Sequence, residues 1–267
     1  MNHKLYQKKI KKEKISILLI QISLLVVFFA LWEILARVNI IDKFLFSCPS
    51  EIIHLLIENI KSKEIFIHIG YSLFETLIAL FIGTFVGIFI AILLWFSKKA
   101  MKIVDPFLVV LNALPKTALA PILIVWAGTG VKGIIVVAIS LSIVMTIISA
   151  LNFFKNVDEE KIKMLLTFNA NKLQILFKLI LPCNVKNLIS IFKINIGLTW
   201  VGVIVGEFLV SRFGIGYLVV YGGQVFKMDL VMMGVLVLSI LAFVMYLLTS
   251  LIEKHYKKWK EKLWIKN

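Results

Sequence analysis

Six long apolar stretches dominate this sequence of 267 residues, and they constrain its fold more than any other feature. They cover residues 15–36, 70–96, 103–127, 133–154, 188–210 and 230–252. A helix needs about 20 apolar residues to cross the hydrocarbon layer of a membrane. Because backbone polar groups must be paired inside that layer, such stretches become helices. The sequence therefore predicts an all-α integral membrane protein with six crossings.

The composition agrees with a membrane protein, since 60% of the residues are hydrophobic and only 17% are charged. The net charge of +15 would suit nucleic acid, but the lysines gather at 1–14, 98–102, 155–187 and 253–267, beside the apolar stretches. Basic residues in such places mark cytoplasmic ends and attract anionic lipid. We therefore expect both termini and these two loops in the cytoplasm, contact with the lipid bilayer and no nucleic-acid partner.

The first apolar stretch and the segment after it have different roles. The stretch 15–36 is longer than the core of a signal peptide and no cleavage site follows it, which predicts a retained membrane anchor. The segment 37–69 contains Pro49 and Ser50, a helix-start signal, followed by apolar residues on one helical face. This pattern predicts an amphipathic helix on the outer surface.

The third stretch carries a lysine between two prolines, Pro115, Lys116 and Pro121. Proline removes a backbone donor and breaks helices, so we expect this span to be bent or broken. A lysine at mid-membrane is costly and seldom faces lipid. Lys116 is either a pathway residue that meets an anionic solute, or a lysine satisfied by freed carbonyls or placed near an interface.

Other motifs are less informative. Glu33, Glu75 and Glu207 lie toward the outer ends of their spans, where they are expected to be interfacial carboxylates beside Arg37 or Arg212 rather than a proton relay. The GxGxxG match at 128–133 joins two spans and predicts a tight loop, not a dinucleotide site. The pairs Gly83/Gly87 and Gly202/Gly206 predict close helix packing. No metal-ligand spacing and no P-loop occurs in the sequence.

The loop 155–187 is polar but has helical spacing. Asn156 or Asp158 can cap a first helix, and Asn169 tolerates the left-handed conformation that ends one. A second helical run, 172–181, leads to Pro182. Two interpretations stay open, an amphipathic pair resting on lipid headgroups and a docking element for a cytoplasmic partner.

This helical pair resembles the cytoplasmic coupling motif of ABC importer permeases, which reads roughly Glu-Ala-Ala, three residues, Gly, nine residues, Ile, one residue, Leu-Pro. Counted back from Leu181-Pro182, Asn169 stands at the Gly position, and Lys163, Met164 and Leu165 stand at Glu-Ala-Ala. The stretches "CPSEI", "SLFETLIALFIGTFVGIFIAILL", "VDPFLVVLNALPKTALAPILIVWAGTG", "GLTWVGVIVGEFL" and "GIGYLV" resemble the nitrate/sulfonate/taurine branch of these permeases.

The resemblance implies a six-helix bundle of the type I importer permease kind, with a cytoplasmic coupling helix pair between helices 4 and 5. Its parts are a basic cytoplasmic N-terminus (1–14), a first transmembrane helix (15–36), an outer amphipathic segment (37–69), a permease core (70–252) and a basic cytoplasmic tail (253–267). The implied coupling residues are Lys163, Met164, Leu165, Phe168, Asn169, Leu181 and Pro182. The candidate pathway residues are Pro115, Lys116, Pro121, Trp126, Trp200 and Glu207.

The resemblance also implies partners and a location. Two copies of the chain would pair in the plasma membrane of a bacterial cell, a separate ATPase dimer would hold ATP and Mg, and an extracytoplasmic binding protein would deliver the solute. The chain itself would have no catalytic activity and bind no cofactor or metal. Its solute would be a nitrate-, sulfonate- or taurine-like anion or a vitamin precursor.

Two other classes of protein remain as alternatives. A secondary transporter or channel would work without an ATPase, and the scarcity of acids at mid-depth disfavours it. A membrane enzyme or sensor would need a polar catalytic cluster, and the sequence offers none.

Overall fold

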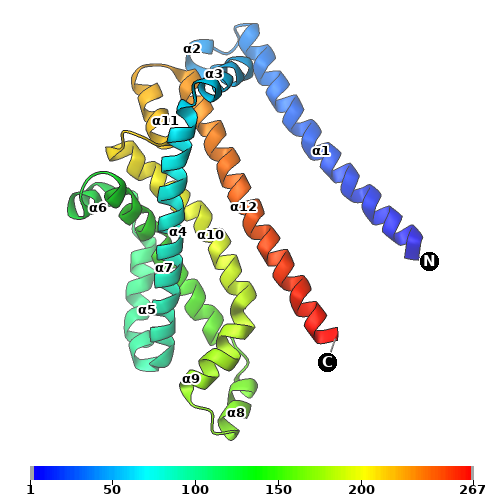
Figure 1. The fold of residues 1–267 in the computed structure, drawn as a ribbon, viewed down its shortest axis with the longest axis vertical. Helices are drawn as coiled ribbons and strands as arrows, with labels where there is room; N and C mark the ends of the chain where they lie inside the picture. The colour runs from blue at the N-terminus through cyan, green and yellow to red at the C-terminus, as the bar shows by residue number, and fades with distance from the viewer. Residues whose placement is uncertain (1–2, 266–267) are drawn as a thin grey trace. The chain divides into compact units, whose positions relative to one another are not determined.

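The computed structural model describes the backbone of residues 3–265 and, apart from Lys14 and Ile252, the side chains of residues 12–254. The described backbone forms helices and contains no strand (Figure 1). The chain divides into two compact units, one of residues 1–65 and 221–233 and one of residues 66–220 and 234–267. Most lysine side chains of the predicted basic ends, 1–14 and 253–267, lie outside the described side chains.

The helices follow the predicted apolar stretches. They are α1 (His3–Arg37), α2 (Lys43–Phe46), α3 (Pro49–Ser62), α4 (Glu64–Phe96), α5 (Lys98–Ala113), α6 (Ala120–Ala127), α7 (Val131–Lys155), α8 (Glu159–Thr167), α9 (Lys172–Ile175), the π-helical turn η1 (Leu176–Ile180), α10 (Leu181–Val210), α11 (Ile215–Gln224) and α12 (Met228–Ile265). Within the described residues, five helical stretches are long and apolar enough to cross a membrane: Ile15–Arg37, Glu64–Phe96, Val131–Lys155, Lys172–Val210 and Met228–Leu251.

The third predicted span is not one continuous helix. Leu114, which precedes Pro115, has an extended backbone conformation (ψ 140°), as residues before proline prefer, and α5 ends there. In the connection, the Ala118 N–H donates to the Pro115 carbonyl (2.9 Å) and the Leu119 N–H to the Lys116 carbonyl (3.1 Å). α6 then starts with Pro121 in its first turn. The expectation of a bent or broken helix is confirmed, and because of this break neither α5 nor α6 is among the five stretches that are long enough to cross a membrane.

Helix α7 lies at the centre of the second unit because two glycine pairs pack against it. A Cβ on Gly83 of α4 would lie 2.5 Å from the Ser142 hydroxyl, and a Cβ on Gly202 of α10 would lie 2.4 Å from the Cα of Ala138. Neither position therefore has room for a larger side chain. The prediction of close packing from the two GxxxG motifs is confirmed, and the partner of both is α7.

A buried polar cluster fixes the register of these three helices. The Asn195 amide of α10 donates to the Thr84 hydroxyl of α4 (2.8 Å) and to the Thr146 hydroxyl of α7 (2.7 Å). All three residues are buried. Because polar groups in an apolar interior need partners, sliding one helix would break both bonds.

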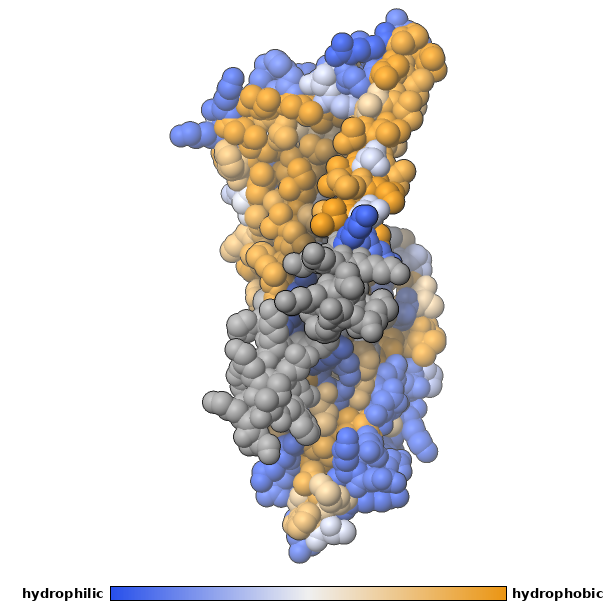
Figure 2. All heavy atoms as spheres, turned by 90° about the vertical axis from the view of Figure 1, so that its right-hand side faces the viewer, coloured by the Kyte–Doolittle hydropathy of each residue, from blue (hydrophilic) through white to orange (hydrophobic). Residues whose placement is uncertain are grey.

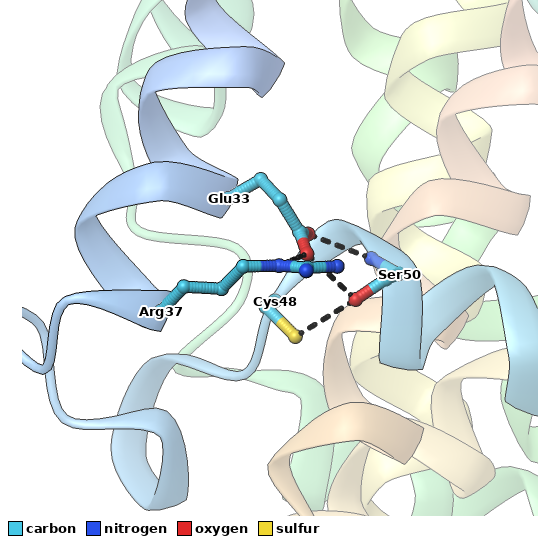
Figure 3. A network of polar contacts seen from close by, with 4 residues as sticks. All are labelled: Glu33, Arg37, Cys48 and Ser50. Atoms are coloured by element: carbon cyan, nitrogen blue, oxygen red, sulfur yellow. Dashed lines mark hydrogen bonds and ion pairs between the residues drawn. The ribbon is translucent and has the colours of Figure 1, made fainter.

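In the first unit, α1 is joined to the start of α3 by Glu33 (Figure 3). Its carboxylate accepts hydrogen bonds from the Ser50 backbone N–H (3.0 Å) and hydroxyl (2.8 Å), and it pairs with Arg37 at 2.7 Å. Pro49 has no N–H and Cys48 gives α3 no side-chain cap, so Glu33 caps this helix from outside. The expected pairing of Glu33 with Arg37 is confirmed.

The surface of the long helices is strongly apolar. Figure 2 shows hydrophobic side chains gathered along these helices and hydrophilic ones around the end that carries α8 and α9. Phe85 of α4 and Leu24 of α1 are more than half exposed. A soluble protein would not leave such belts in water, whereas lipid covers them without cost.

Candidate functional site

The coupling segment, residues 159–180, is formed by α8, α9 and η1. Asp158 caps α8 by accepting from the Glu160 N–H (2.9 Å). α8 ends in a Schellman motif, in which the Ala170 N–H donates to the Leu165 carbonyl (3.0 Å) and the Asn169 N–H to the Leu166 carbonyl (2.9 Å). Asn169 has a φ of 56°, so it makes the left-handed turn that its position predicts.

The second helical run begins with a capping box. The Asn171 side chain accepts from the Gln174 N–H (2.8 Å), and the Gln174 side chain accepts from the Asn171 N–H (2.9 Å). The run does not end at Pro182 but passes through η1 into α10. Proline lacks an N–H and clashes with the carbonyl four residues earlier, and the wider π turn just before it relieves that clash.

One face of the coupling segment is packed against the ends of the long helices. Ile175, Leu176 and Ile180 are buried in a hydrophobic cluster with Leu94 of α4 and Phe154 of α7. Ile162 and Leu165 of α8, each partly buried, pack against the same cluster. Since this apolar face is used within the protein, the segment does not need lipid headgroups to cover it.

The opposite face presents apolar side chains that no described residue covers. Phe168 is 76% exposed, and Met164 is 54% exposed. Leu173 and Phe177 are also more than half exposed. Lys163 and Asn169 of the same segment are exposed as well. Apolar groups at a polar end of a membrane protein are typical of a protein docking surface.

A single lysine connects the coupling segment to α4. The Lys172 ammonium group donates to the Phe96 carbonyl (3.1 Å), one of the last carbonyls of α4. Carbonyls at a helix C-terminus lack partners within the helix and carry partial negative charge, so a lysine stabilises them. Lys172 is not among the residues predicted from the sequence, because only the fold brings it beside the end of α4.

The candidate pathway residues are not gathered at one place. Lys116 is partly exposed and its ammonium group donates to the Asn112 side chain (3.3 Å). Trp126 is 80% exposed, whereas Trp200 is buried in a cluster with Leu80 and Met245. Pro115 and Pro121 bound the connection between α5 and α6. A pathway role for these residues therefore stays a prediction.

Glu207 is buried and holds the connection between α10 and α11. Its carboxylate accepts from the Ser72 hydroxyl (2.5 Å) and from the Gly216 N–H (2.5 Å). A Cβ on Gly214 would lie 2.4 Å from Oε1 of Glu207, so glycine is required there. Glu75 is also buried. The expected pairing of these carboxylates with Arg212 is not found among the described residues, and the backbone of the connection covers Glu207 instead.

These features define a class of protein, a multi-pass helical membrane protein with an ordered helical pair between two of its long helices. The chain belongs to the family of binding-protein-dependent transport system inner membrane components, whose model matches residues 83–258. It is thus a permease of the ABC importer kind.

Curated relatives and solved structures agree with this family. The chain is 25% identical over 235 residues to a putative aliphatic sulfonates transport permease protein of Bacillus subtilis, covering 88% of this chain and 85% of that protein. It is 23% identical over 269 residues to a taurine transport system permease protein of Escherichia coli, with 97% of each covered. An inward-facing structure of the MetNI methionine ABC transporter matches its fold with a TM-score of 0.64 and 17% identity, over 70% of this chain and 94% of that one.

Proposed function

We propose that this chain is the membrane subunit of an ATP-driven importer whose ATPase is a separate protein. The observation that carries the proposal is the coupling segment, fastened to the long helices on one face and apolar and uncovered on the other. A surface anchored in this way can pass a push from a cytoplasmic partner to α4, α7 and α10. Packed helices move as rigid bodies, so such a push can switch the bundle between two arrangements.

The family supplies the rest of the proposal. Two copies of the chain pair in the plasma membrane of a bacterial cell, with both termini in the cytoplasm. An ATPase dimer binds ATP and Mg and docks on the coupling segments, while a binding protein delivers the solute to the outer face. The solute is a nitrate-, sulfonate- or taurine-like anion or a vitamin precursor, and the relatives named for sulfonates and taurine favour an organic anion. Alternating access to a cavity between the two copies moves it inward.

The docking surface is tested by removing its largest exposed side chain. Phe168→Ala deletes an aromatic group that is 76% exposed, so it leaves the fold intact but weakens docking. We expect at least about tenfold less ATPase to co-purify with the variant than with the parent chain, because buried aromatic anchors contribute about 2 kcal/mol or more.

Phe85→Ala is the matched control, since Phe85 lies on α4 and is 62% exposed. Its complex with the ATPase should match the parent. An ATPase that binds the Phe168→Ala chain as strongly as the parent contradicts this docking surface. A parent chain that binds no ATPase and moves solute on an ion gradient alone would instead identify a secondary transporter.

A further inference from the structure

A cavity of about 570 Å³ opens beside the connection between α10 and α11, away from the coupling segment. Its walls come from three places within the second unit. They are Tyr71 of α4, the residues 129–131 that lead into α7, and the residues 210–213 at the end of α10 and just after it. Cavities of about 300–1,000 Å³ suit small-molecule ligands.

Among the described residues that line this cavity, Arg212 alone carries a formal charge. No acidic side chain among the described residues lies within ion-pair distance of its guanidinium group. The hydroxyl of the neighbouring Ser211 is already engaged with Phe213, to whose carbonyl it donates and from whose N–H it accepts (3.1 Å for the latter). The guanidinium fork is therefore available to an oxyanion, which it can hold by two parallel hydrogen bonds.

The wall formed by the start of α7 adds backbone N–H donors, which carry partial positive charge. Gly130 is the N-cap of α7 and provides no side-chain cap. The first N–H groups of this 25-residue helix lack partners within the helix and form its positive end. They support an anion in a cavity that Arg212 already makes positive.

The remaining walls are apolar and rigid. The ring of Tyr71 stacks on that of Phe213 with centroids 4.9 Å apart and planes 14° apart. The loop that carries Phe213 is held in place, since the Gly214 N–H lies within hydrogen-bond distance of His68 Nδ1 (3.1 Å) and the Gly216 N–H donates to the Glu207 carboxylate. These hydrogen bonds hold the backbone that follows Arg212 and Phe213 in one conformation.

We propose that this cavity is a binding site for a small organic anion, whose oxyanion group meets Arg212 and whose apolar part lies against Tyr71 and Phe213. The inference rests on the proposed function. With both termini in the cytoplasm and six crossings, the connections at 128–132 and 211–214 face the outer side of the membrane. There the site would receive the solute before it enters the bundle.

The test measures anion binding directly on the full chain in lipid nanodiscs, by ligand-observed NMR against empty nanodiscs. The probes are ethanesulfonate and its neutral analogue ethyl methyl sulfone. The parent chain should bind ethanesulfonate, and the neutral sulfone should bind at least about tenfold more weakly, because it lacks the charge that Arg212 pairs with. Arg212→Gln should weaken ethanesulfonate binding by about tenfold or more, and Arg212→Lys by less.

Lys132→Gln is the control, since Lys132 is exposed near the start of α7 but does not line the cavity. It should leave ethanesulfonate binding within about twofold of the parent, because screened surface charges contribute little. Equal thermal melting of all the variants shows that they are folded. The proposal is overturned if the parent chain binds no ethanesulfonate, if the sulfone binds equally well, or if Arg212→Gln changes nothing.

Two further measurements show whether the anion site fails independently of the proposed function, and whether Arg212 instead contacts the solute-binding protein. Co-purification of the ATPase tests the proposed function alone, and Arg212→Gln should not affect it. Should Arg212→Gln weaken capture of the solute-binding protein while the parent chain binds no ethanesulfonate, Arg212 meets an acidic side chain of that protein and the small-anion site is refuted.

Discussion

At the scale of single residues, the fold depends on small side chains where helices meet. Membrane helices gain little from hiding apolar surface from one another, since lipid is equally apolar. Close packing and hydrogen bonds must therefore hold them together. Gly83 and Gly202 allow α4 and α10 to approach α7, and Asn195 ties all three helices by hydrogen bonds.

The substitution Gly202→Leu should destabilise the bundle. A Cβ at this position would lie 2.4 Å from the Cα of Ala138, and backbone cannot give way as a flexible side chain can. Overpacking of this kind costs about 1–3 kcal/mol. We expect a lower melting temperature for the purified chain in detergent, measured by intrinsic fluorescence.

Gly197→Leu, on the same helix, is the matched control for this prediction. Nothing lies within 4 Å of a Cβ added there, so the melting temperature should change little. Equal losses from the two substitutions would contradict tight packing of Gly202 against α7 as the cause, since leucine favours a helix more than glycine does at both positions.

At the scale of elements, the coupling segment is organised by local hydrogen bonds. The Asp158 cap, the Schellman motif at Asn169 and the capping box at Asn171 each satisfy backbone groups that a short helix leaves unpaired. Short helices are marginal in water, so these caps and the buried cluster beneath them are needed together. The segment is consequently ordered although it lies between membrane spans.

The turn at Asn169 gives a prediction at this scale. A β-branched residue is strained at a φ of 56°, so Asn169→Val should cost about 1–2 kcal/mol, whereas Asn169→Gly relieves the strain and should cost less. Hydrogen exchange of the amides between 165 and 171 measures this difference. Faster exchange is expected in the valine variant, and indistinguishable rates in the two variants would contradict a left-handed turn.

At the scale of the whole molecule, the distribution of lysines predicts the orientation of the chain. The loops at 98–102 and 155–187 are basic, whereas the connection at 128–132 carries one lysine. This asymmetry predicts that the first two face the cytoplasm and the third faces outward. The proposed docking surface and the proposed anion site would then lie on opposite sides of the membrane.

Cysteine labelling checks this orientation. In a chain with Cys48→Ser and Cys183→Ser, a membrane-impermeant maleimide should label Thr129→Cys in intact spheroplasts and should label Lys99→Cys only after the membrane is opened. Both positions are exposed, so burial does not limit the reaction. Labelling in the reverse pattern would show the opposite topology. It would contradict both a cytoplasmic docking surface and an anion site on the outer face.

Much of this architecture follows from sequence alone. The apolar stretches, the start of α3 at Pro49, the break at Pro115 and the turn at Asn169 depend on residues close together in the chain. Proline and the capping residues act on their own backbone, so no distant contact is needed to predict them. The family resemblance rests on the same local motifs.

Only the tertiary structure determined which side chains contact residues that are far from them in the sequence. Lys172 reaches the end of α4, Glu207 accepts a hydrogen bond from Gly216 beyond the end of its own helix, and Arg212 lines a cavity with Tyr71. A hydrophobic pattern specifies that a helix crosses the membrane but leaves its rotation and neighbours open, because lipid covers every apolar face equally well. Those are set by packing and by the pairing of buried polar groups, which involve residues far apart in the sequence.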